Sequence, residues 1–110
     1  MTFFEDPPPL GNLFGHRLRC ARKLLGLSQD RLGVLIGLDE HTASARISRY
    51  ETGAHEPPIK TARLLANVLG VPLAYLYCDD NRIADLIMQA ITLTEDQWDE
   101  LAAFLSSLNE

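Results

Sequence analysis

The chain has 110 residues, 46% of them hydrophobic, which is enough for one compact domain with a core and a short appendage. Ten lysines and arginines against fifteen aspartates and glutamates give a net charge of −5, which by itself argues against nucleic acid or a membrane surface as partner. This average hides a division, because residues 1–63 carry nine basic and seven acidic side chains, whereas residues 64–110 carry one and eight. We therefore expect the two parts to have different partners or functions.

The sequence predicts neither a membrane span nor a secretion signal. The most apolar stretch, residues 64–77, is interrupted by Asn, Gly and Pro and is shorter than the roughly 20 residues that a span requires. The start of the chain lacks a basic region followed by a long apolar run, so we expect a soluble, cytoplasmic protein. Cys20 and Cys78 are too few for a disulfide framework, and His16 with Cys20 supplies only two ligands, so no metal site is expected.

Glycines and capping residues divide the chain into predicted helices. Residues 1–12 contain three consecutive prolines and predict a disordered, extended tail. Gly26, Gly37, Gly53 and Gly70 each follow an apolar segment of helical period, as residues that end helices with a positive φ do. Because no alternating pattern long enough for a strand occurs, we predict an all-α fold.

The first two predicted helices carry clear local signals. In the first, four apolar residues recur at steps of four, three and four and form one stripe: Phe14, Leu18, Ala21 and Leu25. Ser28 is a good N-cap for the second helix, and Leu27 and Leu32 flank it at the spacing of a hydrophobic staple.

The third predicted helix begins after Asp39, another good N-cap, and runs to Glu51. Its apolar face consists of Ala43, Ile47 and Tyr50. Its opposite face is polar and cationic and carries His41, Thr42, Ala45, Arg46 and Arg49.

Four more helices are predicted. The fourth spans residues 59–69 behind two prolines, and a short fifth spans residues 73–77. A sixth begins after Asp79-Asp80, and Thr94 with Gln97 makes a capping box for the seventh. The last two helices have more apolar surface than a five-helix module needs, including Ile83, Ile87, Ile91, Trp98, Leu101 and Leu105.

Two short helices joined near Gly37, the second with a cationic outer face, suit a protein that holds one helix in the major groove of DNA. Over residues 15–49 three acidic side chains stand against seven basic ones, which are Arg17, Arg19, Arg22, Lys23, Arg31, Arg46 and Arg49. This side of the domain is therefore expected to be locally positive despite the overall charge.

The residues that accompany these helices resemble the Cro/C1-type helix-turn-helix family of phage and bacterial transcription regulators. The matching positions are Gly-Leu-Ser-Gln at 26–29, Leu-Gly at 32–33, Gly37, Ile-Ser-Arg-Tyr-Glu at 47–51, Gly53, Pro57-Pro58 and residues 65–71. The resemblance implies a five-helix, lambda-repressor-like DNA-binding domain over residues 13–78, usually dimeric, whose third helix reads operator bases. Residues 79–110 would then be a helical extension.

The resemblance also implies roles for individual residues. Those it places at DNA are Gln29, Ser44, Ala45, Arg46, Ser48 and Arg49. His41 and Thr42 are added as candidates because His41 shares a helical stripe with Arg49, and not by the resemblance. Arg49 is expected to bond guanine O6 and N7 with both arms, which is worth about 1–3 kcal/mol of discrimination. Arg22 and Glu51 resemble an ion pair of the family between the first and third helices, which makes Arg22 a structural clamp.

The chain departs from the family between Gly37 and Ile47, where nine residues stand in place of about five. One interpretation is that the extra residues lengthen the front of the third helix by about one turn and bring His41 and Thr42 to DNA. The other is that they form only a longer turn. Gly33, where the family commonly has Ala, predicts tight packing of the second helix on the third, at a propensity cost of about 1 kcal/mol.

The sequence thus predicts a sequence-specific regulator of double-stranded DNA, a repressor that acts as a homodimer on a pseudo-palindromic site through the six apolar residues of its last two helices. The alternatives are an antitoxin whose C-terminal helices bind a partner protein, and a protein-interaction module with a vestigial DNA helix. Neither an arrangement of nucleophile, base and orienting group nor a glycine-rich phosphate loop is present, so neither enzyme nor cofactor is expected.

Overall fold

The computed structural model describes residues 12–110, and within that range it contains seven helices and no strand. Their bounds are α1 Leu13–Leu24, α2 Gln29–Leu35, α3 Ala43–Thr52, α4 Ile59–Leu69, α5 Leu73–Leu76, α6 Asn81–Ala90 and α7 Glu95–Leu108. The predicted all-α class is therefore confirmed. The disordered tail predicted for residues 1–12 lies outside the described residues except for Asn12, which precedes α1.

The helix ends follow the local signals of the sequence. All four glycines predicted to end helices have a positive φ, between 70° and 95°. The Ser28 hydroxyl caps α2 by accepting a hydrogen bond of 3.0 Å from the N–H of Arg31. Asp80 caps α6, and Thr94 and Gln97 form both bonds of the capping box at the start of α7. Each such cap is worth about 1 kcal/mol.

The core lies between α1, α2, α3, α4 and α5, and Ala84 of α6 also belongs to it. Its largest completely buried side chains are Leu18, Leu32, Ile47, Leu65 and Leu76. Burial of each stabilises the fold by about 1.5–3 kcal/mol relative to an exposed side chain. The predicted stripe of α1 is correct for its first three residues but wrong for Leu25, which is 53% exposed because α1 ends at Leu24 and the chain turns outward there.

Two glycines let α3 approach its neighbours closely. A Cβ placed on Gly33 of α2 would lie 2.6 Å from the Cβ of Ala43, so the expected tight packing of α2 on α3 is confirmed. A Cβ on Gly15 of α1 would likewise collide with the backbone carbonyl of Glu51. Both glycines are buried, and together they set α3 against α1 and α2.

The third helix begins later than the sequence predicts. Instead of starting after Asp39, α3 starts at Ala43, and residues 40–42 form a turn. The Asp39 carboxylate accepts a hydrogen bond of 2.8 Å from the N–H of His41, and the Asp39 carbonyl accepts one of 3.0 Å from the N–H of Thr42. These bonds close a turn in front of α3, so the extra residues lengthen the turn and leave the helix unextended.

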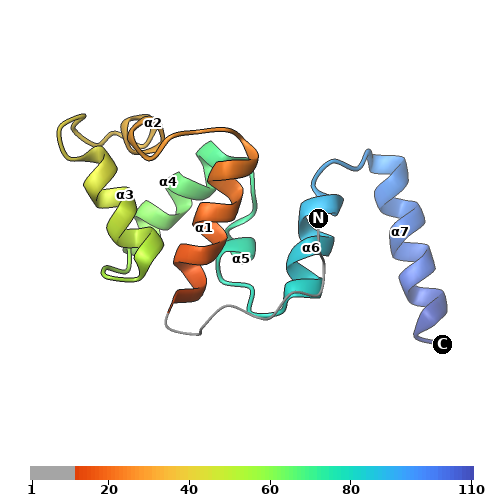
Figure 1. Ribbon diagram of the computed structural model, residues 1–110. Coiled ribbons are helices and arrows are strands. Elements are labelled where there is room, and N and C mark those ends of the chain that lie inside the picture. Colours follow the sequence, from red (N-terminus) through yellow and green to blue (C-terminus); the bar gives the residue numbers. More distant parts are fainter. Residues whose placement is uncertain (1–11) are drawn as a thin grey trace.

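The last two helices, which we name the C-terminal arm (α6 and α7), lead away from the bundle (Figure 1). α6 is anchored by Ala84, which is 3% exposed and belongs to the core, whereas α7 has no buried residue. The molecule is accordingly elongated, with extents of 53 × 29 × 25 Å. None of the helices within residues 12–110 has the length and apolar character needed to cross a membrane.

Candidate nucleic-acid interface

One side of α3 packs into the core, and the opposite side is exposed. Ala43 and Ile47 are completely buried, and Tyr50 is 5% exposed, so one side of α3 belongs to the core. The side chains on the other side that the structure leaves exposed are Ala45, Arg46 and Arg49, with Ser44 and Ser48 half-buried at its margins. We name this side the outer face of α3. It offers two guanidinium groups and a small apolar side chain to whatever lies in front of it.

A buried ion pair clamps α3 to α1. Arg22 Nε lies 2.6 Å from Glu51 Oε2, and Arg22 Nη2 donates to Glu51 Oε1 at 3.0 Å. The third nitrogen of the same guanidinium donates to the carbonyl of Leu27 at 2.8 Å. The hydrogen bond with Glu51 raises the pKa of Arg22 above its ordinary value, although burial opposes this. Arg22 therefore joins α1, the turn before α2 and the end of α3.

Gln29 belongs to the same network. Its Nε2 donates to Glu51 Oε1 at 3.1 Å, and its Oε1 accepts a hydrogen bond of 3.4 Å from the Ser44 hydroxyl. The amide of Gln29 thus bridges both ends of α3 at the start of α2. The sequence predicted that Gln29 faces DNA and gave no sign of this bridge, because nothing in the local spacing indicates a partner 22 residues away.

His41 and Thr42 lie in the turn before α3 and are both exposed. Because the helix starts at Ala43, His41 is not one turn behind Ala45 on a helical stripe, as the sequence predicted. It borders instead an open depression of about 520 Å³ between this turn and α2, lined by Ser28, Asp30, Arg31, Val34, Glu40 and His41. The same stretch carries two exposed carboxylates, those of Asp39 and Glu40, shortly before the start of α3.

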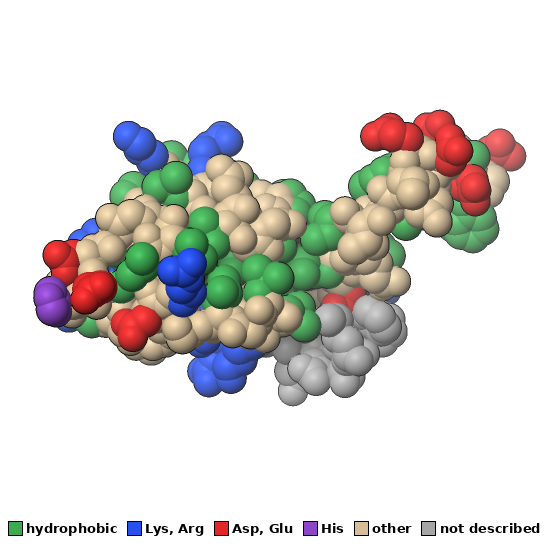
Figure 2. Space-filling view, turned by 90° about the horizontal axis from the view of Figure 1, so that it is seen from above, with side chains coloured by type: hydrophobic (Ala, Val, Ile, Leu, Met, Phe, Trp, Pro, Cys, Tyr) green, Lys and Arg blue, Asp and Glu red, His purple; other side chains and the backbone are tan. Residues whose placement is uncertain are grey.

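The distribution of charge differs in part from the expectation. Of the seven basic residues counted over 15–49, Arg17 is 5% exposed and Arg22 is engaged with Glu51, so neither contributes a free surface charge. The five that remain exposed are Arg19, Lys23, Arg31, Arg46 and Arg49. Acidic side chains gather at the far end of the molecule, over α7 (Figure 2). Other acidic side chains lie at the opposite end, so what changes along the long axis is the net charge, which is positive over residues 12–78 and negative over residues 79–110.

Comparison with known proteins places this arrangement in a family. Residues 18–76, which run from α1 through α5, match the helix-turn-helix family. The chain belongs to the Cro/C1-type helix-turn-helix family. α2 and α3 take the places of the two helices of the helix-turn-helix, the second of which lies in the major groove in DNA-binding proteins that use this motif. Family and fold are those of a transcription regulator.

Solved structures and curated relatives agree with this assignment. The crystal structure of the transcriptional regulator BswR is similar over 84% of this chain and 92% of its own, with 45% identity and a TM-score of 0.83. A hypothetical transcription factor, NHTF from Neisseria, shares the fold at 23% identity and a TM-score of 0.62, over 77% of this chain and 97% of its own.

Two curated relatives are similar over a shorter region. An HTH-type transcriptional regulator of Sinorhizobium medicae is 29% identical over 75 residues, which cover 68% of this chain and 51% of the relative. The SPbeta prophage-derived regulator YonR of Bacillus subtilis is 36% identical over 64 residues, 58% of this chain and 56% of the relative. The chain thus spans about half the length of the curated relatives it matches.

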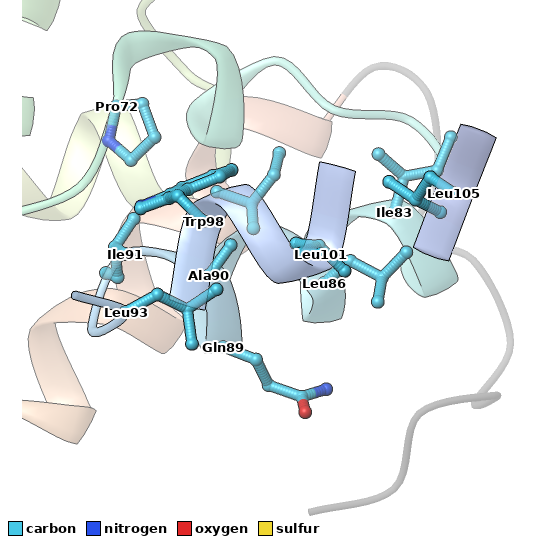
Figure 3. A pocket seen from close by; sticks show the side chains of 11 residues that line it. Pro72, Ile83, Leu86, Gln89, Ala90, Ile91, Leu93, Trp98, Leu101 and Leu105 are labelled. Atoms are coloured by element: carbon cyan, nitrogen blue, oxygen red, sulfur yellow. The ribbon is translucent and has the colours of Figure 1, made fainter. Parts of the chain in front are cut away.

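The C-terminal arm follows the helix-turn-helix match and encloses an apolar groove of about 490 Å³ between α6 and α7 (Figure 3). The groove is lined by all six residues that the sequence assigned to a dimer interface, namely Ile83, Ile87, Ile91, Trp98, Leu101 and Leu105. Four of them are between 41% and 51% exposed, and Ile87 and Leu101 are half-buried. Pro72, at the start of α5, also borders the groove.

Proposed function

We propose that this protein is a sequence-specific transcription repressor that binds double-stranded DNA as a homodimer on a pseudo-palindromic site. The observation that carries the proposal is the two-sided character of α3. Its inner residues are buried and clamped through Glu51, while Arg46 and Arg49 on its outer face are exposed. A helix that reads bases needs both features, since a rigid support behind it preserves the register of its contacts in front.

The proposed contacts divide by chemistry. Arg49 bonds guanine edges with both arms, and Ala45 touches a thymine methyl group. Arg46, Ser44 and Ser48 lie beside them and bond bases or phosphates. His41 and Thr42 reach phosphates from the turn before α3, and Gln29 contributes at the start of α2 while it holds Ser44 in place.

The proposed dimer is built by the C-terminal arm. Apolar side chains around the groove remain 41–51% exposed. Their burial against a second copy would lower the free energy of the system, which favours association. A second copy is the occupant we propose, because a twofold axis places two reading helices about one DNA turn, roughly 34 Å, apart. We propose repression because a dimer seated in two successive major grooves excludes other proteins from the same stretch of duplex.

Selection of bound sequences from a random duplex library tests the proposal directly. We expect a pseudo-palindromic consensus and an affinity that falls linearly with salt on logarithmic axes. Transcription in vitro from a promoter that overlaps the selected site should decrease when the protein is added. Absence of any enriched sequence would contradict the DNA-reading role of α3.

The outer face of α3 is tested by Arg49→Ala. Loss of a bidentate guanine contact should relax the base preference at one position of each half-site by about 1–3 kcal/mol and also weaken the affinity. Competition binding with single-base variants of the selected duplex measures this preference. Arg82→Ala, which removes an exposed charge from α6, is the matched control and should leave the preference intact. An unchanged preference in Arg49→Ala would remove this residue from the reading set.

A further inference from the structure

A buried arginine connects α1 to the start of the C-terminal arm. Arg17 is 5% exposed, and its Nε and Nη2 donate to the carbonyl of Cys78 at 2.9 and 2.8 Å. Nη2 also donates to Oδ1 of Asn81 at 3.0 Å, and the guanidinium carbon lies 5.8 Å from the centre of the Tyr75 ring. Cys78 lies just beyond α5, and Asn81 is the first residue of α6. A single side chain of α1 is thus hydrogen-bonded both to the segment that precedes the arm and to the first residue of the arm.

These hydrogen bonds differ in kind from the apolar contact that also anchors α6. Ala84 packs into the core, with Ile87 and Met88 packed against it. Apolar contacts are non-directional, so they resist separation of α6 from the bundle more than they resist its rotation. Hydrogen bonds weaken steeply when their angles change, and a buried guanidinium that loses its acceptors leaves an uncompensated charge. Rotation of α6 would therefore distort the hydrogen bonds of Arg17.

We infer that Arg17 is a positioning residue that fixes the orientation of the C-terminal arm relative to α3 and thereby sets the half-site spacing that the dimer accepts. This inference rests on the proposed function, because the spacing matters only if two copies associate through their arms. Arg17 belongs to the basic residues of the first helix, yet its buried position separates it from the exposed ones that face solvent.

The elongated shape makes a small rotation at this joint consequential. α3 and α7 lie at opposite ends of the molecule, whose longest extent is 53 Å (Figure 1). If α3 lies about half that length from the pivot, a rotation of roughly 7° moves it by one base-pair step of about 3.4 Å. An arm that rocks by this amount would let the dimer bind half-sites at several spacings.

The first test needs no DNA. Residual dipolar couplings of backbone N–H groups report the orientation of α6 and α7 relative to α1–α4 in the full chain. In the unchanged protein both groups should fit one alignment tensor. In Asn81→Ala and Arg17→Lys, couplings of the arm should shrink relative to those of the bundle, because motion averages them. Asn67→Ala and Arg63→Lys make the same substitutions at exposed positions of α4 and should leave the single tensor intact.

The second test uses the duplex selected from the random library, with its two halves moved together or apart by one and two base pairs. The unchanged protein should lose roughly tenfold or more in affinity per step, whereas Asn81→Ala should lose less than about threefold. Binding to an isolated half-site should be equal in both. Asn81→Asp retains an acceptor for Arg17 and should restore the sharp dependence.

The outcomes separate the inference from the proposed function. If the dipolar couplings of the arm and of the bundle still fit one alignment tensor in folded Asn81→Ala, Arg17 does not fix the orientation of the arm, whatever the protein does to DNA. Averaged couplings with an unchanged spacing preference would overturn the role in spacing. If no duplex with two half-sites is selected, the proposed function fails and the role in spacing fails with it, while the couplings still decide whether Arg17 holds the arm. If Arg17→Lys does not fold, Asn81→Ala alone decides, because it removes one acceptor and leaves the guanidinium in place.

Discussion

Two ion pairs in the described part of the chain show how burial decides what an ion pair contributes to stability. The side chains of Arg22 and Glu51 are 11% and 4% exposed, whereas those of Arg82 and Asp80 are 72% and 39% exposed, and their closest atoms are 4.0 Å apart. Removal of one member of a buried pair leaves the other charge without compensation, while water replaces a lost exposed partner. The first pair is therefore structural, and the second contributes little.

Substitution of each arginine tests this difference. Arg22→Ala should lower the free energy of unfolding by about 3 kcal/mol, because it strands the Glu51 carboxylate and the Leu27 carbonyl. Arg82→Ala, at the exposed pair, should change it by less than about 0.5 kcal/mol. Urea denaturation followed by circular dichroism measures both. Equal losses in the two variants would show that burial does not set the strength of the clamp.

Partners that are distant in sequence were predictable only where a resemblance to known sequences supplied them. A resemblance to known sequences implied the pairing of Arg22 with Glu51, which the structure forms at 2.6 Å. Nothing comparable indicated that Arg17 would turn inward to Cys78, because the two residues are 61 positions apart and Arg17 lies among other basic residues of the same helix. Helical period places a residue on a face, but it does not decide whether a cation at the edge of that face reaches a carbonyl or water.

At the scale of helices, ends that depend on one capping residue were predicted well, and ends with competing caps were not. Thr94 and Gln97 begin α7 as expected, because no alternative cap stands near them. In front of α3, Asp39 and Thr42 are both residue types that favour an N-cap position. Asp39 instead closes a turn, and the contact of Ala43 with Gly33 fixes where the helix starts. That contact is tertiary, so the sequence left both interpretations open.

Gly33→Ala tests how tightly α2 and α3 meet. A methyl group at this position would lie 2.6 Å from the Ala43 Cβ. That Cβ is bonded directly to the backbone, so it cannot rotate away. Overpacking of this kind costs about 1–3 kcal/mol, which outweighs or cancels the gain of about 1 kcal/mol in helix propensity. We expect a net loss of stability of about 1 kcal/mol in urea denaturation.

The control for this variant is Asn67→Ala at an exposed position of α4, where helix propensity acts without a steric cost. Asn67→Ala should be neutral or slightly stabilising. If Gly33→Ala proved as stable as Asn67→Ala, the two helices would be able to move apart without loss, and the close approach would not be what positions α3.

At the scale of the whole molecule, the C-terminal arm is the part whose apolar surface the single chain does not cover. α7 has no buried residue, and Leu105, Phe104 and Leu108 on it are 47%, 60% and 64% exposed. Only the first of these three lines the groove between α6 and α7. The proposed dimer therefore distinguishes between apolar residues on the same helix according to whether they face the groove.

Light scattering at roughly tens of micromolar should give the mass of a dimer for the unchanged protein, as expected when apolar surface of this kind is buried between two copies. Leu105→Glu places a charge in the groove and should shift the mass to that of a monomer, with helical content retained because Leu105 is not part of the core. Phe104→Glu, a neighbour that does not line the groove, should remain a dimer. A monomer in the unchanged protein, with and without DNA, would refute the interface.

The change of net charge along the long axis, from positive over residues 12–78 to negative over residues 79–110, has a consequence for encounters with any polyanion. The field of the polyanion exerts a torque on such a molecule and turns its α3 end forward before contact, although the net charge is −5. A collision led by α7 is repelled, so fewer encounters are wasted on the wrong orientation. At 0.1 M salt the field decays over about 10 Å, a fraction of the 53 Å length, and the torque then acts only during the final approach.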